Sequence, residues 1–106
     1  MYFFNKLFTF TIIKTANTLI GMEIEFSKHS VNQMRLRSIY SKIVELIIQN
    51  PDSIITQDYK TKIYSKLLVE ESKTYLYRVF VNENKTPPMI ITVYKTSKIE
   101  KYGYQV

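Results

Sequence analysis

The sequence predicts one α+β domain in which two N-terminal helices pack on a four-stranded antiparallel sheet. Apolar residues recur at helical spacing before Pro51 and alternate with polar residues after it. Short polar turns separate the later segments, which is typical of antiparallel neighbours. A chain of 106 residues is long enough for a single core and too short for several domains.

Residues 1–21 differ from the rest of the chain, because they are rich in Phe and Thr and contain no acid. The apolar run between Lys6 and Lys14 is far shorter than the roughly 20 residues of a membrane-spanning helix. No small-residue cleavage site of the kind that ends a signal peptide is present. We therefore predict an apolar extension over 1–21 that tolerates truncation at Gly21, a main domain over 22–106, a cytoplasmic location and no membrane partner.

Two helices are predicted before Pro51. Ser27 is the expected N-cap of a helix that ends near Arg37, with Val31 and Met34 on its apolar side. A second helix is predicted over 41–49, because a proline disfavours the helical conformation in the residue before it. Its expected buried stripe is Ile43, Val44, Leu46 and Ile47.

Four strands are predicted after Pro51, over 53–57, 62–70, 74–82 and 89–96. Alternate side chains of a strand point to opposite faces, so the alternation assigns one face to the core. The expected core is Val31, Met34, Ile43, Leu46, Ile47, Leu67, Val69, Val79, Val81, Ile91 and Val93.

The opposite face of this sheet combines cations with aromatic rings, at Tyr64, Lys66, Arg78, Thr92 and Tyr94. Such a surface suits single-stranded RNA, because cations neutralise phosphates while rings stack on unpaired bases. Tyrosine and lysine are also ordinary residues on the solvated side of an antiparallel sheet. Alternation alone leaves both readings open.

The composition narrows the chemistry. A net charge of +6 favours phosphate backbones or acidic proteins as partners, although it also serves solubility. The absence of cysteine excludes a disulfide scaffold and a zinc ribbon. No glycine-rich phosphate loop, metallohydrolase spacing or Ser-His-Asp arrangement is visible, which argues against a bound metal or cofactor.

His29 is the only histidine and the first candidate for acid–base chemistry near neutral pH. Arg37 and Arg78 could clamp a phosphate bidentately. Each also has a plain structural reading, as a histidine that bonds a neighbour in the first helical turn or as a surface arginine. Together the three residues favour a metal-independent ribonuclease.

The segments FSKHSVNQMRLRSI, QNPD and MIITVYKTSKIEKY together resemble the family catalogued as domain of unknown function 4258, over about residues 24–102. The positions that match the family pattern are His29, Arg37, Ile39, Asn50, Pro51, Asp52, Thr92 and Tyr94.

The sequence departs from this pattern at two places. Gln33 stands where the family has an arginine, and Ser38 stands where it has a glycine. Arg35 is a poor substitute for the missing arginine, since a shift of two residues turns a side chain about 200° around a helix. The departures keep open an alternative function, a catalytically inactive interaction module that binds RNA or protein.

The family is similar to RelE-like, barnase-like and colicin-like ribonucleases, so the resemblance implies their two-layer fold and a toxin of a toxin–antitoxin pair. RNA and an acidic antitoxin are the expected partners. The candidate catalytic residues are His29, Arg37, Arg78 and Tyr94, and the candidate RNA-binding residues are Arg35, Tyr64, Lys66, Thr92, Lys98 and Tyr102.

Overall fold

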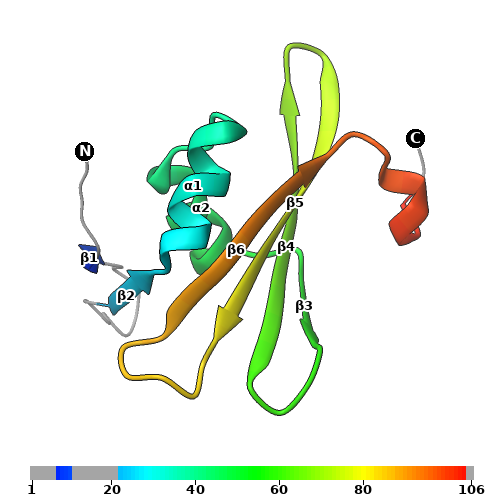
Figure 1. Ribbon diagram of the computed structural model, residues 1–106. Coiled ribbons are helices and arrows are strands. Elements are labelled where there is room, and N and C mark those ends of the chain that lie inside the picture. Colours follow the sequence, from blue (N-terminus) through cyan, green and yellow to red (C-terminus); the bar gives the residue numbers. More distant parts are fainter. Residues whose placement is uncertain (1–6, 11–21, 105–106) are drawn as a thin grey trace, which may run out of the picture.

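The computed structural model describes residues 7–10 and 22–104, which form a six-stranded mixed sheet with two helices on one face (Figure 1). The strands are β1 (Leu7–Phe10), β2 (Met22–Phe26), β3 (Ser53–Thr56), β4 (Thr61–Glu70), β5 (Lys73–Asn82) and β6 (Met89–Thr96), in the order β1-β2-β6-β5-β4-β3. The helices are α1 (Lys28–Leu36) and α2 (Ser41–Gln49), and a 3₁₀ helix, η1 (Ile99–Tyr102), follows β6.

The prediction of a four-stranded antiparallel sheet with N-terminal helices is wrong. Strands β1 and β2 precede the helices, and β2 pairs with β6 in parallel, with Glu25 opposite Met89 and Phe26 opposite Ile90. A strand of five residues has little alternation to detect. Its parallel partner also lies far along the chain, so no local turn indicates the pairing.

Strand β1 falls within the predicted extension over 1–21 and pairs with β2 at the edge of the sheet. The rest of that extension, including the proposed truncation site at Gly21, lies outside the described residues. No helix in the described part of the chain is long and apolar enough to cross a membrane.

Both predicted helices are confirmed. Ser27 is the N-cap of α1, since its side-chain oxygen accepts a hydrogen bond from the Ser30 amide at 3.0 Å. Its hydroxyl also donates to the Ile91 carbonyl at 2.9 Å, which ties the start of α1 to β6. Helix α2 ends at Gln49, directly before Asn50 and Pro51.

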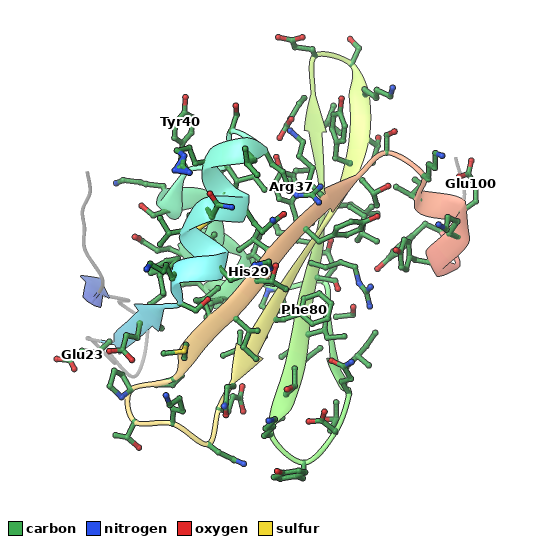
Figure 2. All side chains as sticks on the ribbon, viewed as in Figure 1. Glu23, His29, Arg37, Tyr40, Phe80 and Glu100 are labelled. Carbon is green, nitrogen blue, oxygen red and sulfur yellow. The ribbon has the colours of Figure 1, made fainter. Side chains whose placement is uncertain are left out.

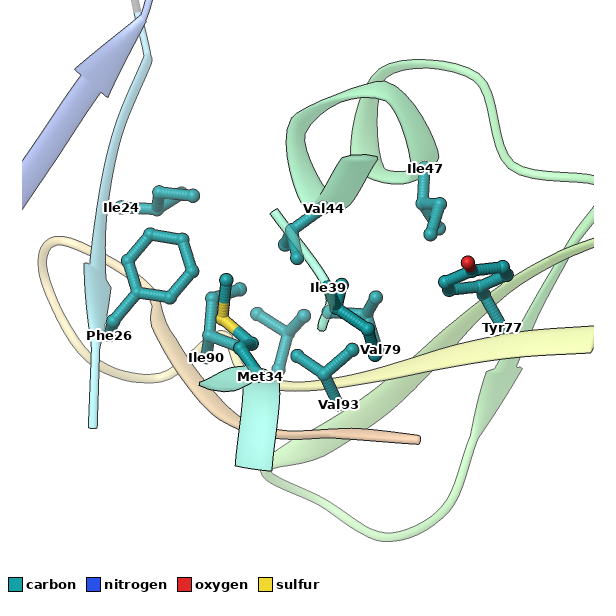
Figure 3. Close-up of a cluster of buried hydrophobic side chains, with 11 residues drawn as sticks. Ile24, Phe26, Met34, Ile39, Val44, Ile47, Tyr77, Val79, Ile90 and Val93 are labelled. Carbon is teal, nitrogen blue, oxygen red and sulfur yellow. The ribbon is translucent and has the colours of Figure 1, made fainter. Parts of the chain in front are cut away.

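The core lies between the helices and one face of the sheet (Figure 3). Its buried members are Ile24, Phe26, Met34, Ile39, Val44, Ile47, Tyr77, Val79, Val81, Ile90 and Val93. Five predicted core residues are confirmed, namely Met34, Ile47, Val79, Val81 and Val93. A sixth, Ile43, is partly buried and packs against this cluster.

Three predicted core residues are instead exposed. Val31 is 37% exposed and Leu46 is 40% exposed, because the buried faces of the two helices centre on Met34 and Ile47 and are narrower than expected. Val69 is 70% exposed near the tip of the β4–β5 hairpin, which extends beyond the helices in Figure 1.

The predicted faces of β4 are reversed. Tyr64 lies opposite Val79 and therefore faces the helices, whereas Leu67 lies opposite Leu76 on the other face. The alternation misleads because this second face is also partly apolar. Buried residues outside the main core occur at Ile63, Leu76 and Ile99, the last of them on η1, which contacts β5.

A β-bulge explains the error at Ile91. Phe80 pairs with Thr92 and Val81 pairs with Ile90, so Ile91 is an extra residue in β6. The bulge shifts the alternation by one position, and the buried residues are Ile90 and Val93.

Candidate functional site

The candidate site lies where β6 continues beyond the end of its parallel partner β2. Strand β2 pairs with β6 only at Met89 and Ile90 within the described residues, so the later part of β6 has no strand on that side. Helix α1 follows β2 directly and packs along this part of β6. Side chains from the second half of α1 can therefore reach around the edge to the sheet face that points away from the helices.

An open groove of about 290 Å³ lies at this edge. Its lining comes from α1 and its C-cap residue, and from β5, β6 and η1, which lie far from α1 in the sequence. The lining residues are Gln33, Arg37, Arg78, Phe80, Thr92, Val93, Tyr94 and Tyr102, of which Arg37 and Phe80 are labelled in Figure 2.

Two arginines carry the positive charge of the groove, and the guanidinium of each packs against aromatic rings. The Arg37 guanidinium carbon lies 5.0 Å from the centre of the Tyr94 ring, and the Arg37 Nε donates to the Gln33 Oε1 at 3.2 Å. The Arg78 guanidinium carbon lies 4.7 Å from the centre of the Tyr102 ring and 5.4 Å from that of Phe80. Stacking of this kind restrains a guanidinium and leaves its edge donors available.

The groove is electrostatically positive. No carboxylate is among its lining residues, and neither Arg37 nor Arg78 forms a salt bridge within residues 7–10 and 22–104. Hydrogen bonding with Tyr102 lowers the pKa of Tyr94, and the charges of Lys101 and Arg37 act in the same direction against the effect of burial. The arrangement favours negative charge, whether on a bound group or on Tyr94 itself.

His29 lies outside this groove. It is exposed on α1 (Figure 2) and lines a separate depression of about 670 Å³ together with Lys28, Val31, Asn32 and Arg35. Arg35 donates to the side chain of Asn32 there and does not reach the groove. Arg35 therefore does not contribute its charge to the groove.

The prediction that Tyr64 and Lys66 lie on the sheet face opposite the helices is wrong, because the register of β4 turns both toward the helices. The Tyr64 hydroxyl donates to Glu83, and burial is the main cause that raises its pKa. Lys66 donates to the Asn50 carbonyl at 2.9 Å and forms an ion pair with Asp52 at 3.4 Å. It thus fixes the Asn-Pro-Asp segment to β4.

Five of the predicted site residues come together in the groove, namely Arg37, Arg78, Thr92, Tyr94 and Tyr102. Lys98 is exposed directly before η1 and is not part of the lining. Sequence reasoning missed Gln33 and Phe80 as site residues. A signal existed for each, since Gln33 stands four residues before Arg37 on one helical face, and Phe80 shares the alternation of Arg78.

A family model described as Domain of unknown function (DUF4258) matches residues 26–95, which confirms the resemblance seen in the sequence. None of the curated proteins and none of the solved structures matches the chain. The matched range contains both helices, strands β3 to β5 and every groove-lining residue except Tyr102.

Proposed function

Because the chain belongs to the DUF4258 family, whose model it matches over residues 26–95, and that description assigns no activity, we propose a function from the groove. The protein binds single-stranded RNA there and cleaves it without a metal ion, as an endoribonuclease of the toxin type.

One observation carries the proposal. Arg37 and Arg78 are both half-buried, come from different elements and converge on one groove without an acidic partner in the described residues. Burial of a cation is unfavourable unless an anion compensates it. A phosphate matches the planar donor geometry of two guanidinium groups.

Several features favour RNA over other anions. Aromatic side chains at Phe80, Tyr94 and Tyr102 line the same groove, and unpaired bases stack on such rings. The net charge of +6 attracts a polyanion. In RNA the 2′-hydroxyl can attack the neighbouring phosphate, and the two arginines would stabilise the negative charge that builds on the phosphorus oxygens.

The experiment uses purified protein with chelator present, a single-stranded RNA and a DNA of the same sequence. We expect cleavage of the RNA alone, with a 2′,3′-cyclic phosphate at the new end. Arg37→Ala and Arg78→Ala should each weaken RNA binding about 10- to 100-fold, because a hydrogen bond to a charged group contributes about 1.5 to 3 kcal/mol.

Arg35→Ala is the matched control, since it removes the same charge from α1 outside the groove. It should change RNA affinity far less than Arg37→Ala. Equal losses in the two variants would mean that RNA binds by net charge alone, and cleavage of the DNA would contradict attack by a 2′-hydroxyl.

An inactive interaction module is the second candidate. The position of His29 outside the groove, together with Gln33 in place of the family arginine, favours it. This reading predicts RNA binding that depends on Arg37 and Arg78 but no cleavage at any pH.

A toxin with an exposed positive groove also needs a neutralising partner. We expect a small acidic antitoxin encoded next to this gene, because complementary charge speeds and orients association. Expression of the chain alone should arrest growth, and expression of the neighbouring gene should relieve the arrest. An isolated gene and harmless expression would argue against the toxin role.

A further inference from the structure

Cleavage in the groove needs a group that accepts a proton from the attacking 2′-hydroxyl. The only histidine lies in the other depression. Among the groove-lining residues, the arginines stay protonated and the side chains of Gln33 and Thr92 do not titrate in the useful range. Two tyrosines remain, Tyr94 and Tyr102.

The surroundings of the two tyrosines distinguish their roles. Tyr94 lies on β6 with its ring under the Arg37 guanidinium and directly opposite Arg78 on β5, and hydrogen bonding with Tyr102 is the main cause that lowers its pKa. Tyr102 lies on η1 with its ring against Arg78. Tyr94 therefore adjoins both groove arginines, and its lowered pKa agrees with an oxygen that carries negative charge readily.

We infer that Tyr94 is the catalytic base of the groove and that Tyr102 is the residue that positions and polarises it. This inference rests on the proposed function. The substrate class that it requires is RNA, because only a 2′-hydroxyl adjacent to the bound phosphate offers the proton that Tyr94 takes, and the groove's aromatic rings favour unpaired bases.

The step balances without a cofactor. The ionised Tyr94 oxygen takes the 2′-hydroxyl proton, the 2′-oxygen forms a bond to phosphorus, and the bond from phosphorus to the 5′-oxygen breaks. Water protonates the departing 5′-oxygen, and Tyr94 returns its proton to the solvent. The products are a 2′,3′-cyclic phosphate and a free 5′-hydroxyl, while Arg37 and Arg78 compensate the charge on the phosphorus oxygens.

The charged and titratable groups around Tyr94 come from each neighbouring element. Arg37 approaches from α1, Arg78 is its direct partner on β5, and Lys101 and Tyr102 come from η1. The charges among these neighbours are all positive, so they stabilise the ionised form of Tyr94 together. The pH at which cleavage becomes maximal should therefore depend on these neighbours.

The experiment compares Tyr94→Phe, Tyr102→Phe and His29→Ala with the wild-type chain in single-turnover RNA cleavage and in RNA binding, both with chelator. Tyr94→Phe keeps the ring under Arg37 and should lower the cleavage rate about 100- to 10,000-fold, the usual loss for an acid–base group. Its RNA affinity should stay close to that of the wild type.

Tyr102→Phe should retain cleavage but move its rise to higher pH, because the hydrogen bond that favours the ionised Tyr94 is gone. A tyrosine with only a packing role would not move this profile. His29→Ala should cleave as the wild type does. Tyr40→Phe is the control for loss of a tyrosine hydroxyl, since Tyr40 is 75% exposed and lies outside the groove.

The outcomes separate this inference from the proposed function. If the wild type cleaves RNA and Tyr94→Phe cleaves it equally well, the assignment of Tyr94 is wrong while the proposed function stands. Loss of cleavage in His29→Ala also overturns the assignment. If the wild type binds RNA without cleaving it, both the enzymatic function and the assignment of a catalytic base are wrong, and the inactive interaction module is the function that remains.

Discussion

Ser38, in the link between α1 and α2, adopts a backbone conformation that favours glycine. Its φ is 55°, in the left-handed region where a side chain crowds the following carbonyl. The next residue, Ile39, is buried in the core, so the link has to turn sharply at this point. A glycine at this position would avoid the strain of this turn.

Ser38→Gly should therefore raise the free energy of unfolding by up to about 1 kcal/mol, because relief of the strain exceeds the added entropy of the unfolded chain. Urea denaturation measures the change. Ser53→Gly in β3 is the matched control and should lower stability by about 0.5 to 1 kcal/mol, as expected for glycine within a strand. A loss of stability in Ser38→Gly would contradict the account of strain.

Glu45 is a second residue whose environment opposes its charge. It is buried on α2, its Oε2 has no hydrogen-bond partner in the described part of the chain, and burial raises its pKa despite the opposing charge of Lys42. A raised pKa in the folded state means that the protonated carboxyl is the form that favours folding. That contribution is present at low pH and is lost as the pH rises through the folded-state pKa.

Glu45→Gln should stabilise the protein at neutral pH by about 1 kcal/mol, since the amide has no charge to bury. The advantage over the wild type should shrink as the pH falls and Glu45 becomes protonated. Denaturation midpoints over a pH series test this. Glu23→Gln, at an exposed position on β2, should show no such trend.

Among the elements, the bulge in β6 has the largest effect on the site. It places Ile90 and Val93 on the core face and so returns Thr92 and Tyr94 to the face of Arg78. The carbonyl of the extra residue, Ile91, receives the hydroxyl of the α1 cap. The inserted residue thus has two effects: it sets which β6 side chains enter the core, and its carbonyl fixes the start of α1, the helix that precedes Arg37.

Ile90→Ala should lower the free energy of unfolding by about 2 to 5 kcal/mol, because the side chain is fully buried and its removal leaves a cavity. Ile91→Ala, at a half-buried position one residue away, should cost much less. Thermal denaturation of the pair measures the difference. A larger loss of stability for Ile91→Ala than for Ile90→Ala would contradict the bulge and favour the strict alternation that the sequence predicts.

Local signals predicted the elements well and their assembly poorly. Ser27 as a cap and Pro51 as a helix stop are chemical features of a few neighbouring residues, and both helices were predicted from them. The parallel pairing of β2, the bulge at Ile91 and the contact of η1 with β5 depend on segments that are not neighbours in the sequence. For the site, Arg78 and Tyr94 followed from alternation, whereas the separation of His29 from Arg37 required the position of α1 on the sheet.

For the whole molecule, the arrangement of charge matters more than its sum. The lysines near the core face are paired with acids, as in Lys62 with Glu83 and Lys95 with Glu70, whereas the groove arginines have no such partner in the described residues. The groove therefore offers a polyanion two cations that no described acid neutralises, with Lys98 and Lys101 nearby in the chain.

RNA affinity should consequently fall with salt, and the slope of log affinity against log salt should become less steep by about 0.7 for each phosphate contact removed. Arg37→Ala and Arg78→Ala should each lower the slope by this amount, and Arg35→Ala should leave it unchanged. Binding titrations at several salt concentrations provide the measurement. Identical slopes in all three variants would place the RNA elsewhere on the surface.

The groove takes side chains from α1, from the sheet and from η1, and these segments leave the ribosome in that order. A nascent chain that has completed both helices and all of β5 still lacks Tyr94 and Tyr102. The two ends of the site are brought together only after β6 has paired and η1 has docked on β5. The groove is therefore complete only after η1 has been made, and any activity that depends on the tyrosine pair arises after that point.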